Sequence, residues 1–312
     1  MEKILITGGS GFLGRELALK LKNNYEVTLG ARNNGLNQKA EECTGCRAIP
    51  LDVSNILSVQ DAFNSIAPDI VIHAGATKYV NLSEAQPLEC IDVNVLGSQN
   101  IARVAIEKGT KVVVGISTDK AAPPVNHIYG NSKALMEKMF CSLNFSNQTN
   151  FTCVRFGNIA WSTGSVFPIW KRMMETNGKI ESTGPDMKRF FFSVSDAADL
   201  VIRSINNIDM TQGKILSMKM KASKVSNLLE VWEKLYGTQW VDIGRRLGET
   251  DHESMIGLIE LKHTTEILLD NIEHFLTSTR DTPSIHVKDV FTTEVAENHS
   301  EDEMIQLIQL GM

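Results

Sequence analysis

The chain has 312 residues, of which 42% are hydrophobic and 22% are charged, and its formal net charge is -6. A chain of this length buries roughly three quarters of its unfolded surface, which is enough for one large domain or two joined lobes. The negative charge and the scattered basic residues argue against nucleic-acid binding. No apolar run is long enough to span a bilayer, and the first predicted strand begins too close to Met1 to leave room for a signal peptide. We therefore expect a cytoplasmic protein that does not bind membranes.

A glycine-rich turn follows the first apolar segment of the chain. Lys3-Ile4-Leu5-Ile6-Thr7 predicts a short buried strand that runs into Gly8-Gly9-Ser10-Gly11-Phe12-Leu13-Gly14. The first glycine allows a tight bend, the third lets the backbone approach a pyrophosphate, and the last lets the next helix pack on the sheet. The N-terminus of that helix, predicted over residues 12–21, then faces the phosphates of a dinucleotide. The residues expected at this end of the cofactor are Gly8, Gly11, Phe12, Leu13 and Gly14.

The following segments supply the rest of the expected cofactor site. A strand predicted over residues 25–29 ends at Gly30-Ala31-Arg32 without the acidic residue that would bind a ribose 2′-hydroxyl. Arg32 suits a 2′-phosphate instead, so NADP is favoured over NAD. A later pair of residues is expected to border the adenine, and the small residues after His73 let a cofactor approach the backbone. The residues predicted here are Arg32, then Asp52 and Val53 at the adenine, and Ala74, Gly75 and Ala76.

Four polar residues follow an apolar run in the middle of the chain. Val112-Val113-Val114-Gly115-Ile116 predicts a buried strand that delivers Ser117-Thr118-Asp119-Lys120 to its carboxyl end. Ligands bind at this edge in open α/β sheets. The alternative for Asp119 and Lys120 is a surface ion pair, which contributes little to stability.

The next predicted helix carries a tyrosine and a lysine one turn apart. Pro123-Pro124 breaks the chain, and Asn126 is the expected N-cap. Tyr129 and Lys133 then lie on one face of the helix. A neighbouring ammonium and a stacked nicotinamide cation favour the phenolate that a base needs at neutral pH. The spacing alone also fits a half-buried tyrosine beside a solvated lysine, and it is the glycine-rich turn that favours a catalytic pair.

Together these motifs resemble the extended short-chain dehydrogenase/reductase superfamily. Ser117-Thr118-Asp119-Lys120-Ala121 narrows the resemblance to the soluble, inverting UDP-N-acetylglucosamine 4,6-dehydratases, over residues 3–253. Lys120 is informative because related hexose dehydratases usually carry Asp-Glu at this position and epimerases usually carry small hydroxyl residues. Tyr129, where membrane-bound retaining relatives often carry methionine, favours the inverting branch, which supplies bacterial surface glycans.

The resemblance implies a role for each residue of the central motif. Tyr129 and Lys133 are the dehydrogenase pair and also contact the cofactor, while Thr118 binds the reacting hydroxyl. Tyr129 takes the proton of the hydroxyl on sugar carbon 4 while hydride passes to NADP. Lys120 in its neutral form then removes the proton on carbon 5, and Asp119 protonates the hydroxyl that leaves carbon 6. The last two groups titrate as a coupled pair, because a charged lysine lowers the pKa of a neighbouring carboxyl.

Other motifs resemble the contacts of this family to its UDP-sugar substrate. Arg189-Phe190-Phe191-Phe192 and Arg246-Leu247-Gly248-Glu249 resemble the diphosphate and uridine contacts, and the planar fork of arginine suits phosphate. Either arginine alternatively pairs with a surface carboxylate. Thr250 departs from the lysine of the family, and Asp251-His252-Glu253 only partly restores the pattern. The predicted substrate residues are Lys78, Asn158, Ser165, Val166, Arg189, Arg246 and Glu249.

Alternating strand and helix patterns favour an α/β fold, and the resemblance implies a Rossmann-type doubly wound parallel sheet with a smaller mixed α/β substrate lobe. We expect an NADP-binding domain over residues 1–160, to which some later segments return, a nucleotide-sugar lobe over 161–280 and a C-terminal tail over 281–312. Related enzymes pair two of their helices in a dimer, so a homo-oligomer is expected. Beyond residue 160, helices are predicted near residues 166–176, 195–207 and 223–236.

The favoured function is an NADP-dependent lyase that converts UDP-N-acetylglucosamine to a 4-keto-6-deoxy sugar with inversion at carbon 5. Two alternatives stay open. A nucleotide-sugar 4-epimerase uses the same oxidation at carbon 4 but needs no Lys120, and a catalytically idle NADP-binding scaffold or sensor does not need Tyr129 and Lys133 together. The 5 cysteines and 7 histidines are scattered without zinc spacing, so no metal is expected.

Overall fold

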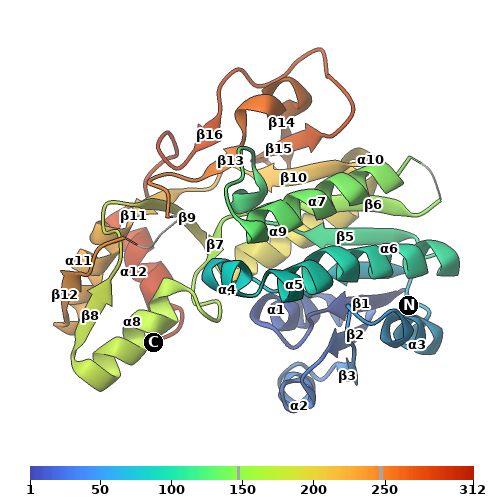
Figure 1. Cartoon of the computed structure of the whole chain (residues 1–312), viewed down its shortest axis with the longest axis horizontal. Coiled ribbons are helices and arrows are strands. Elements are labelled where there is room, and N and C mark those ends of the chain that lie inside the picture. Colours follow the sequence, from blue (N-terminus) through green and yellow to red (C-terminus); the bar gives the residue numbers. More distant parts are fainter. Residues whose placement is uncertain (146–147, 246–248) are drawn as a thin grey trace.

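The computed structural model describes residues 1–145, 148–245 and 249–312. Within these ranges, a 9-stranded sheet with helices on both faces lies beside a smaller lobe (Figure 1). In spatial order the strands are β14 (Thr264–Leu269), β15 (Ile272–Ser278), β10 (Lys214–Met218), β6 (Asn150–Val154), β5 (Val112–Ile116), β4 (Ile70–His73), β1 (Lys3–Thr7), β2 (Glu26–Ala31) and β3 (Arg47–Pro50). The strands from β10 to β3 run parallel, whereas β15 pairs antiparallel with both β10 and β14. The predicted doubly wound α/β sheet is confirmed.

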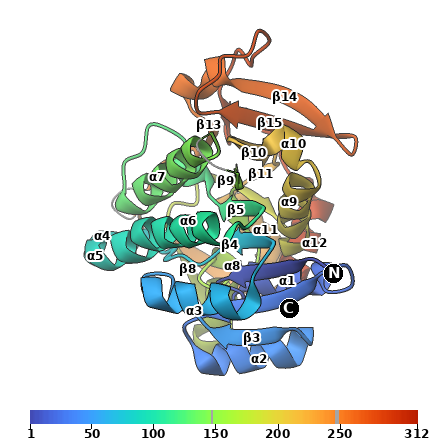
Figure 2. The same cartoon turned by 90° about the vertical axis from the view of Figure 1, so that its right-hand side faces the viewer.

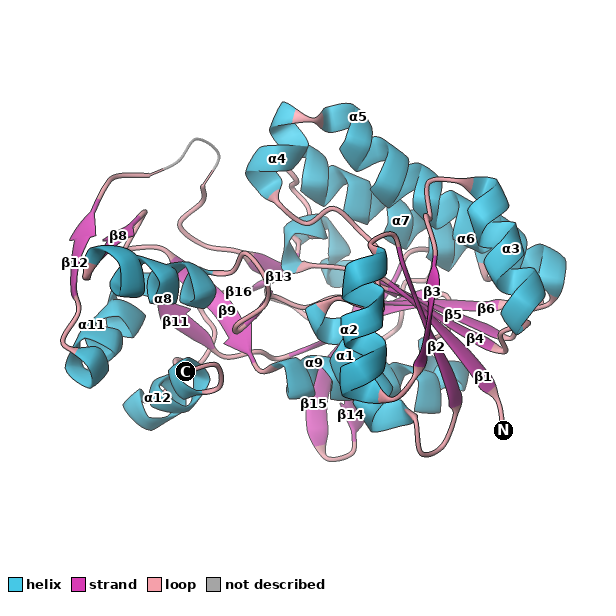
Figure 3. Cartoon of the chain, turned by 90° about the horizontal axis from the view of Figure 1, so that it is seen from below, coloured by secondary structure: helices cyan, strands magenta, loops and turns pink. Residues whose placement is uncertain are grey.

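Helices cover both faces of this sheet (Figures 2 and 3). The strand β1 shows why, because its alternate residues point to opposite faces and are buried on both. Ile4 and Ile6 share a core with α1 (Phe12–Leu21) and α9 (Val194–Asn206), and α2 (Asn34–Thr44) packs beside β2 and β3. Leu5 shares the opposite core with α3 (Ile56–Ile66), α6 (Gly97–Lys108) and α7 (Ile128–Leu143).

The segment between β4 and α6 is helical in short pieces. It consists of α4 (Val80–Ala85), α5 (Pro87–Cys90) and the π-helical η1 (Ile91–Leu96). Asn94 of η1 donates a hydrogen bond to Ser132 Oγ of α7 at 2.9 Å, and its Oδ1 accepts one from the Thr77 amide at 2.8 Å. These contacts fix the loop after β4 against the helix that carries Tyr129.

The helix α7 begins one residue later than predicted. His127 is its N-cap, and Nδ1 of this histidine accepts a hydrogen bond from the Gly130 amide at 2.9 Å. The expectation that Asn126 would cap the helix was wrong, because a histidine ring nitrogen can accept the amide hydrogen bond that asparagine usually takes.

The smaller lobe is built around aromatic side chains. Phe167 and Trp170 of α8 (Val166–Asn177) pack on Trp232 of α11 (Val225–Tyr236), and these side chains are at most 2% exposed. Of the three helices predicted beyond residue 160, α8 and α11 lie in this lobe and α9 packs on the large sheet. The short strands of this region pair as β7 (Asn158–Ile159) and β11 (Ala222–Lys224) with β9 (Lys188–Phe192), β8 (Lys179–Ser182) with β12 (Gln239–Asp242), and β13 (Ser254–Ile256) with β16 (Phe291–Thr292).

The chain returns to the large sheet after residue 160. α9, α10 (Ile208–Thr211), β10, η3 (Leu258–His263) and the β14–β15 hairpin all pack in this part of the molecule. Near the C-terminus, α12 (Glu301–Gln309) packs on α11 of the smaller lobe (Figure 1). In the part of the chain that the structure describes, no helix is long and apolar enough to span a bilayer.

Candidate active site

A cavity of about 520 Å³ opens at the carboxyl ends of β1, β2, β4 and β5. This position is the topological switch point of the sheet, because β2 and β4 lie on opposite sides of β1. The structure brings most of the predicted cofactor residues together around this cavity. Those that line it are Gly8, Gly11, Phe12, Leu13, Gly14, Arg32, Ala74, Gly75, Ala76, Tyr129 and Lys133.

The turn after β1 fits a dinucleotide diphosphate. Gly8 has a φ of 68°, and a Cβ at this position would lie 2.8 Å from the Ala74 carbonyl oxygen. A Cβ on Gly14 would lie 2.6 Å from Gly9 Cα, so any larger residue would push α1 off the turn. α1 follows Gly11 without a side-chain cap, which leaves its first amide groups for an anion. The residues present therefore fit the nicotinamide dinucleotide that the resemblance implies.

Arg32 lies at the rim of this cavity. Its side chain is 53% exposed, and Nη1 is 3.1 Å from Glu89 Oε1 at the end of α5. An exposed ion pair of this kind contributes little, so a 2′-phosphate could replace Glu89 at small cost. The role of Arg32 as a 2′-phosphate contact stays a prediction.

Asp52 and Val53 do not line this cavity. Asp52 Oδ1 accepts hydrogen bonds from the amide and hydroxyl of Ser54 at 3.0 and 2.7 Å, which closes a turn before α3. Val53 is buried, and its side chain lies where Cβ atoms on Gly75 and Gly97 would meet it. Local turn chemistry and core packing thus account for both residues, and their contact with the adenine stays a prediction.

Tyr129 and Lys133 line the cavity from α7, and both are buried. Lys133 Nζ donates a hydrogen bond to the Ile116 carbonyl oxygen at 2.7 Å, and burial lowers the pKa of this lysine to about 8. Burial raises the pKa of the Tyr129 phenol to about 12, while the charge of Lys120 opposes this rise. The phenol is therefore neutral in the protein alone, and it needs further positive charge beside it to act as a base at neutral pH.

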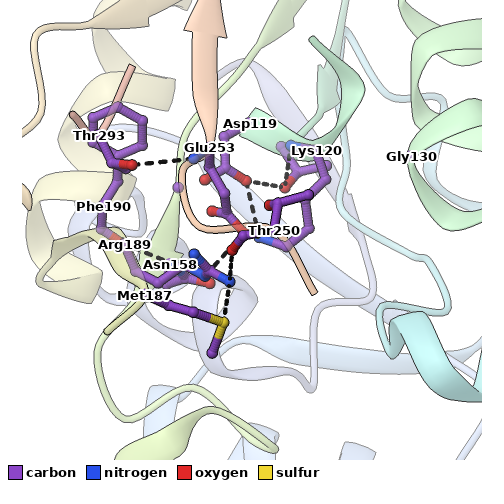
Figure 4. Close-up of polar contacts among 12 residues, drawn as sticks. Asp119, Lys120, Gly130, Asn158, Met187, Arg189, Phe190, Thr250, Glu253 and Thr293 are labelled. Carbon is purple, nitrogen blue, oxygen red and sulfur yellow. Dashed lines mark hydrogen bonds and ion pairs between the residues drawn. The ribbon is translucent and has the colours of Figure 1, made fainter. Parts of the chain in front are cut away.

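Asp119 and Lys120 form a buried pair at the start of the short 3-10 helix η2 (Asp119–Ala121). Asp119 Oδ1 accepts hydrogen bonds from Thr118 Oγ1 at 3.0 Å and from Lys120 Nζ at 3.1 Å. The Asp119 and Lys120 side chains are only 0% and 20% exposed, so the alternative of a solvated surface ion pair is wrong. Lys120 Nζ also lies 2.9 Å from Glu253 Oε1 (Figure 4).

The surrounding charges shift the pKa values of the Asp119 and Glu253 carboxyls in opposite directions. Burial and the charge of Glu253 raise the pKa of Asp119 to about 8, although Lys120 opposes this rise. Burial raises the pKa of Glu253, but the charges of Lys120 and Arg189 outweigh it and lower that pKa to about 2. Burial lowers the pKa of Lys120, yet both carboxylates together raise it above its ordinary value. Near neutral pH, Asp119 is thus protonated, while Lys120 and Glu253 are charged.

A second cavity of about 730 Å³ extends from the first toward the smaller lobe. Lys78, Lys120 and Asn158 line both cavities. Asn158 Nδ2 donates a hydrogen bond to the Phe190 carbonyl oxygen at 3.0 Å, and burial lowers the pKa of Lys78. Of the other predicted substrate residues, Ser165 lines the first cavity, and Val166, Arg189 and Glu249 line the second.

Arg189 is engaged by the segment that leads into β13. Its Nη2 donates to the Thr250 carbonyl oxygen at 2.8 Å, its Nη1 donates to the Asp251 carbonyl oxygen at 3.2 Å, and its Nε lies 3.3 Å from Glu253 Oε1 (Figure 4). The guanidinium therefore orders this segment, and its contact with a diphosphate stays a prediction. Glu249 Oε1 accepts a hydrogen bond from Thr183 Oγ1 at 3.3 Å, whereas Arg246 lies outside the described residues.

Glu253 is the site residue that the sequence did not reveal. It stands immediately before β13, and its amide donates a hydrogen bond to Thr293 Oγ1 at 3.1 Å. No local pattern places this carboxylate beside η2, because the contact depends on β13 packing against η2. The only indication of Glu253 in the sequence was that Asp251-His252-Glu253 partly restores the substrate-binding pattern of the dehydratases that the chain resembles.

Known proteins with similar sequences include enzymes that act on UDP-sugars. An inverting UDP-N-acetylglucosamine 4,6-dehydratase of Campylobacter jejuni is 33% identical over 263 residues, which cover 82% of this chain and 77% of that protein. A UDP-glucose 4-epimerase of Rickettsia bellii is also 33% identical, over 279 residues that cover 85% of this chain and 80% of that protein.

The fold comparison covers nearly the whole chain. The X-ray structure of Pen from Bacillus thuringiensis matches with a TM-score of 0.89 at 26% identity, and the match covers 98% of this chain and 96% of that one. Residues 4–273 match the family described as polysaccharide biosynthesis protein. The chain therefore belongs to the polysaccharide biosynthesis protein family, within the extended short-chain dehydrogenase/reductases.

Proposed function

We propose that this protein is an NADP-dependent dehydratase that converts UDP-N-acetylglucosamine to a 4-keto-6-deoxy sugar with inversion at carbon 5. The observation that carries the proposal is a carboxyl, an amine and a phenol on continuous cavities: Asp119, Lys120 and Tyr129. The inverting dehydratase of Campylobacter jejuni supports the reaction and the substrate, and the family match supports a place in polysaccharide biosynthesis.

The chain would hold the cofactor with the residues that line the first cavity. The glycine turn and the N-terminus of α1 suit the diphosphate, Arg32 suits the 2′-phosphate, and Lys133 suits a ribose hydroxyl. When bound, NADP would supply the hydride chemistry, taking hydride from sugar carbon 4 and giving it back at carbon 6.

The side chains of the protein itself carry out the proton transfers. Tyr129 takes the proton of the carbon 4 hydroxyl, and Thr118, 8% exposed, holds that hydroxyl in place. The resulting ketone acidifies the proton on carbon 5, which Lys120 removes after losing its own proton. Once hydride has returned to carbon 6, a proton adds to carbon 5 from the opposite face, which inverts that centre. Asp119 is protonated near neutral pH and gives its proton to the hydroxyl that leaves carbon 6.

A 4-epimerase is the second candidate, because the UDP-glucose 4-epimerase of Rickettsia bellii is equally similar in sequence. An epimerase needs the tyrosine and lysine of α7 but neither an acid for a leaving hydroxyl nor an amine at carbon 5. Burying such groups costs free energy, so a site that keeps them without using them is disfavoured. The same cost argues against a catalytically idle scaffold.

Incubation with UDP-N-acetylglucosamine and NADP in deuterated water tests the proposal. We expect a product that has lost one water molecule and carries deuterium at carbon 5, with the inverted configuration in its proton couplings. A product of unchanged mass that is inverted at carbon 4 would identify an epimerase. Unchanged substrate would favour the idle scaffold.

The choice between NADP and NAD can be tested at Arg32. We expect Arg32→Ala to weaken NADP binding by about 10- to 100-fold, because a charge-assisted contact to phosphate contributes about 1.5–3 kcal/mol. Binding of NAD should hardly change, since NAD has no 2′-phosphate. Fluorescence titration of both cofactors measures this, with Lys234→Ala as an exposed-cation control that does not line the cavity. Equal losses for the two cofactors would contradict the assignment.

A further inference from the structure

Glu253 is a buried carboxylate beside the proposed catalytic pair, and the mechanism above assigns it no step. Its side chain is 9% exposed, and Oε1 lies 2.9 Å from Lys120 Nζ and 3.3 Å from Arg189 Nε (Figure 4). Lys120 Nζ in turn reaches Asp119 Oδ1 at 3.1 Å. One ammonium therefore bridges two carboxyl groups that come from distant parts of the sequence.

Each of the two carboxyl groups also keeps one buried oxygen, Asp119 Oδ2 and Glu253 Oε2, without a hydrogen-bond partner in the described part of the chain. A buried ionised carboxylate needs hydrogen bonds or cations to replace the water it has lost. A single ammonium between two buried carboxyl groups therefore favours a state in which one of them carries a proton, as in pairs of carboxyls that share a site.

The neighbours of each carboxyl decide where this proton stays. Glu253 Oε1 has two cations within 3.3 Å, Lys120 and Arg189, and these favour its ionised form. Asp119 has a fully buried side chain and pairs, among the described residues, with Lys120 alone. Burial favours the neutral form of a carboxyl. The proton therefore resides on Asp119.

We infer that Glu253 is a positioning residue: its carboxylate keeps Asp119 protonated, holds Lys120 at the junction of the two cavities, and so makes Asp119 the acid of the site. This inference rests on the proposed dehydratase function for its kinetic consequence. Its electrostatic consequence can be observed without any sugar. The charged and titratable side chains that act on this cluster are Lys120, His127, Tyr129, Arg189 and Glu253.

The direct test is the titration of Asp119 in the full-length protein with NADP and without sugar, followed by carboxyl carbon NMR and assigned with Asp119→Asn. In the protein with Glu253, the Asp119 signal should titrate near pH 8. With Glu253→Gln, Lys120 still attracts the Asp119 charge while the opposing carboxylate is gone. The Asp119 titration should then move about one to three pH units lower.

Two further variants make the result decisive. Glu273→Gln removes a carboxylate from an exposed ion pair with Lys219 at 3.1 Å and should leave the Asp119 titration unchanged. Glu253→Asp keeps the charge and should keep Asp119 protonated at neutral pH, and it serves as the test if Glu253→Gln does not fold. An Asp119 titration that is the same with and without the charge at residue 253 would overturn the inference.

A kinetic readout connects the cluster to the reaction. Glu253→Gln should lower kcat for elimination by about a hundredfold, the range of general acid catalysis, with KM for the sugar nucleotide nearly unchanged. Glu253→Asp should recover part of this loss. A rise in KM with unchanged kcat would show that Glu253 only shapes the substrate cavity. If the unaltered protein forms no dehydrated product, the proposed function fails, and the NMR titration still decides the inference.

Discussion

Replacement of Lys120 by alanine is expected to abolish elimination while cofactor binding persists. Lys120 lines both cavities, and its Nζ lies 3.1 Å from Asp119 Oδ1. Loss of a proton-transfer group typically costs about 10²- to 10⁴-fold in rate. Mass spectrometry of the product and fluorescence titration of NADP measure the two properties separately. Lys219→Ala is the matched control, because Lys219 forms ion pairs only with surface carboxylates among the described residues.

Oxidation at carbon 4 should survive in Lys120→Ala, because it depends on Tyr129. A keto sugar that retains its carbon 6 hydroxyl, or cofactor that accumulates in its reduced form, would support this division of labour. Normal formation of the dehydrated product by Lys120→Ala would refute the role of the lysine.

The pH dependence of elimination reveals which form of Lys120 reacts. The pKa of Lys120 is raised, so at pH values below that pKa the neutral fraction of Lys120 grows about tenfold with each unit by which the pH rises. Asp119 stays protonated below a pKa of about 8 and loses its proton above it. If neutral Lys120 and protonated Asp119 are both required, the rate should rise up to about pH 8 and then level off. A rate that is constant below pH 8 and falls above it would show that Lys120 acts as an ammonium.

Replacement of Arg155 by methionine is expected to destabilise the protein by about 3–5 kcal/mol, the range for breaking a buried ion pair by removing one partner. Arg155 is 1% exposed and lies 2.7 Å from Glu137 Oε2 and 2.8 Å from Glu260 Oε1. Without the arginine, two carboxylates stay behind in the interior with their hydrogen bonds broken. A lower midpoint in thermal and urea unfolding, followed by circular dichroism, measures the effect.

The replacement of Arg155 should also disturb the position of the active-site residue Glu253. Arg155 Nη1 donates a hydrogen bond to the Met255 carbonyl oxygen at 2.9 Å, and Met255 lies in β13, two residues after Glu253. As a control, Lys234→Met removes a cation from an exposed pair with Glu301 and should change stability by less than about 1 kcal/mol. Similar unfolding midpoints for both variants would contradict a structural role for the buried cluster.

Local pattern predicted much of the fold. The apolar run of β5 and the strand, turn and helix from Lys3 to Leu21 form where the sequence predicts them, because their hydrophobic period and glycine positions are local properties. The N-cap of α7 was misplaced by one residue, since Asn126 and His127 can both accept an amide hydrogen bond. Burial, which decides between a surface ion pair and a reactive pair at Asp119 and Lys120, depends on packing and was left open.

The sequence by itself determined the alternating strands and helices of an α/β fold, the glycine turn and the tyrosine and lysine of α7, because each follows from residues close together in the chain. Only the tertiary structure decided that Glu253 and Arg189 join Asp119 and Lys120. These residues meet because β13 packs against η2, and a contact between distant segments leaves no periodic trace in the sequence. The protonation of Asp119 follows from that contact, since a buried carboxyl responds to charges within a few ångströms of it in space.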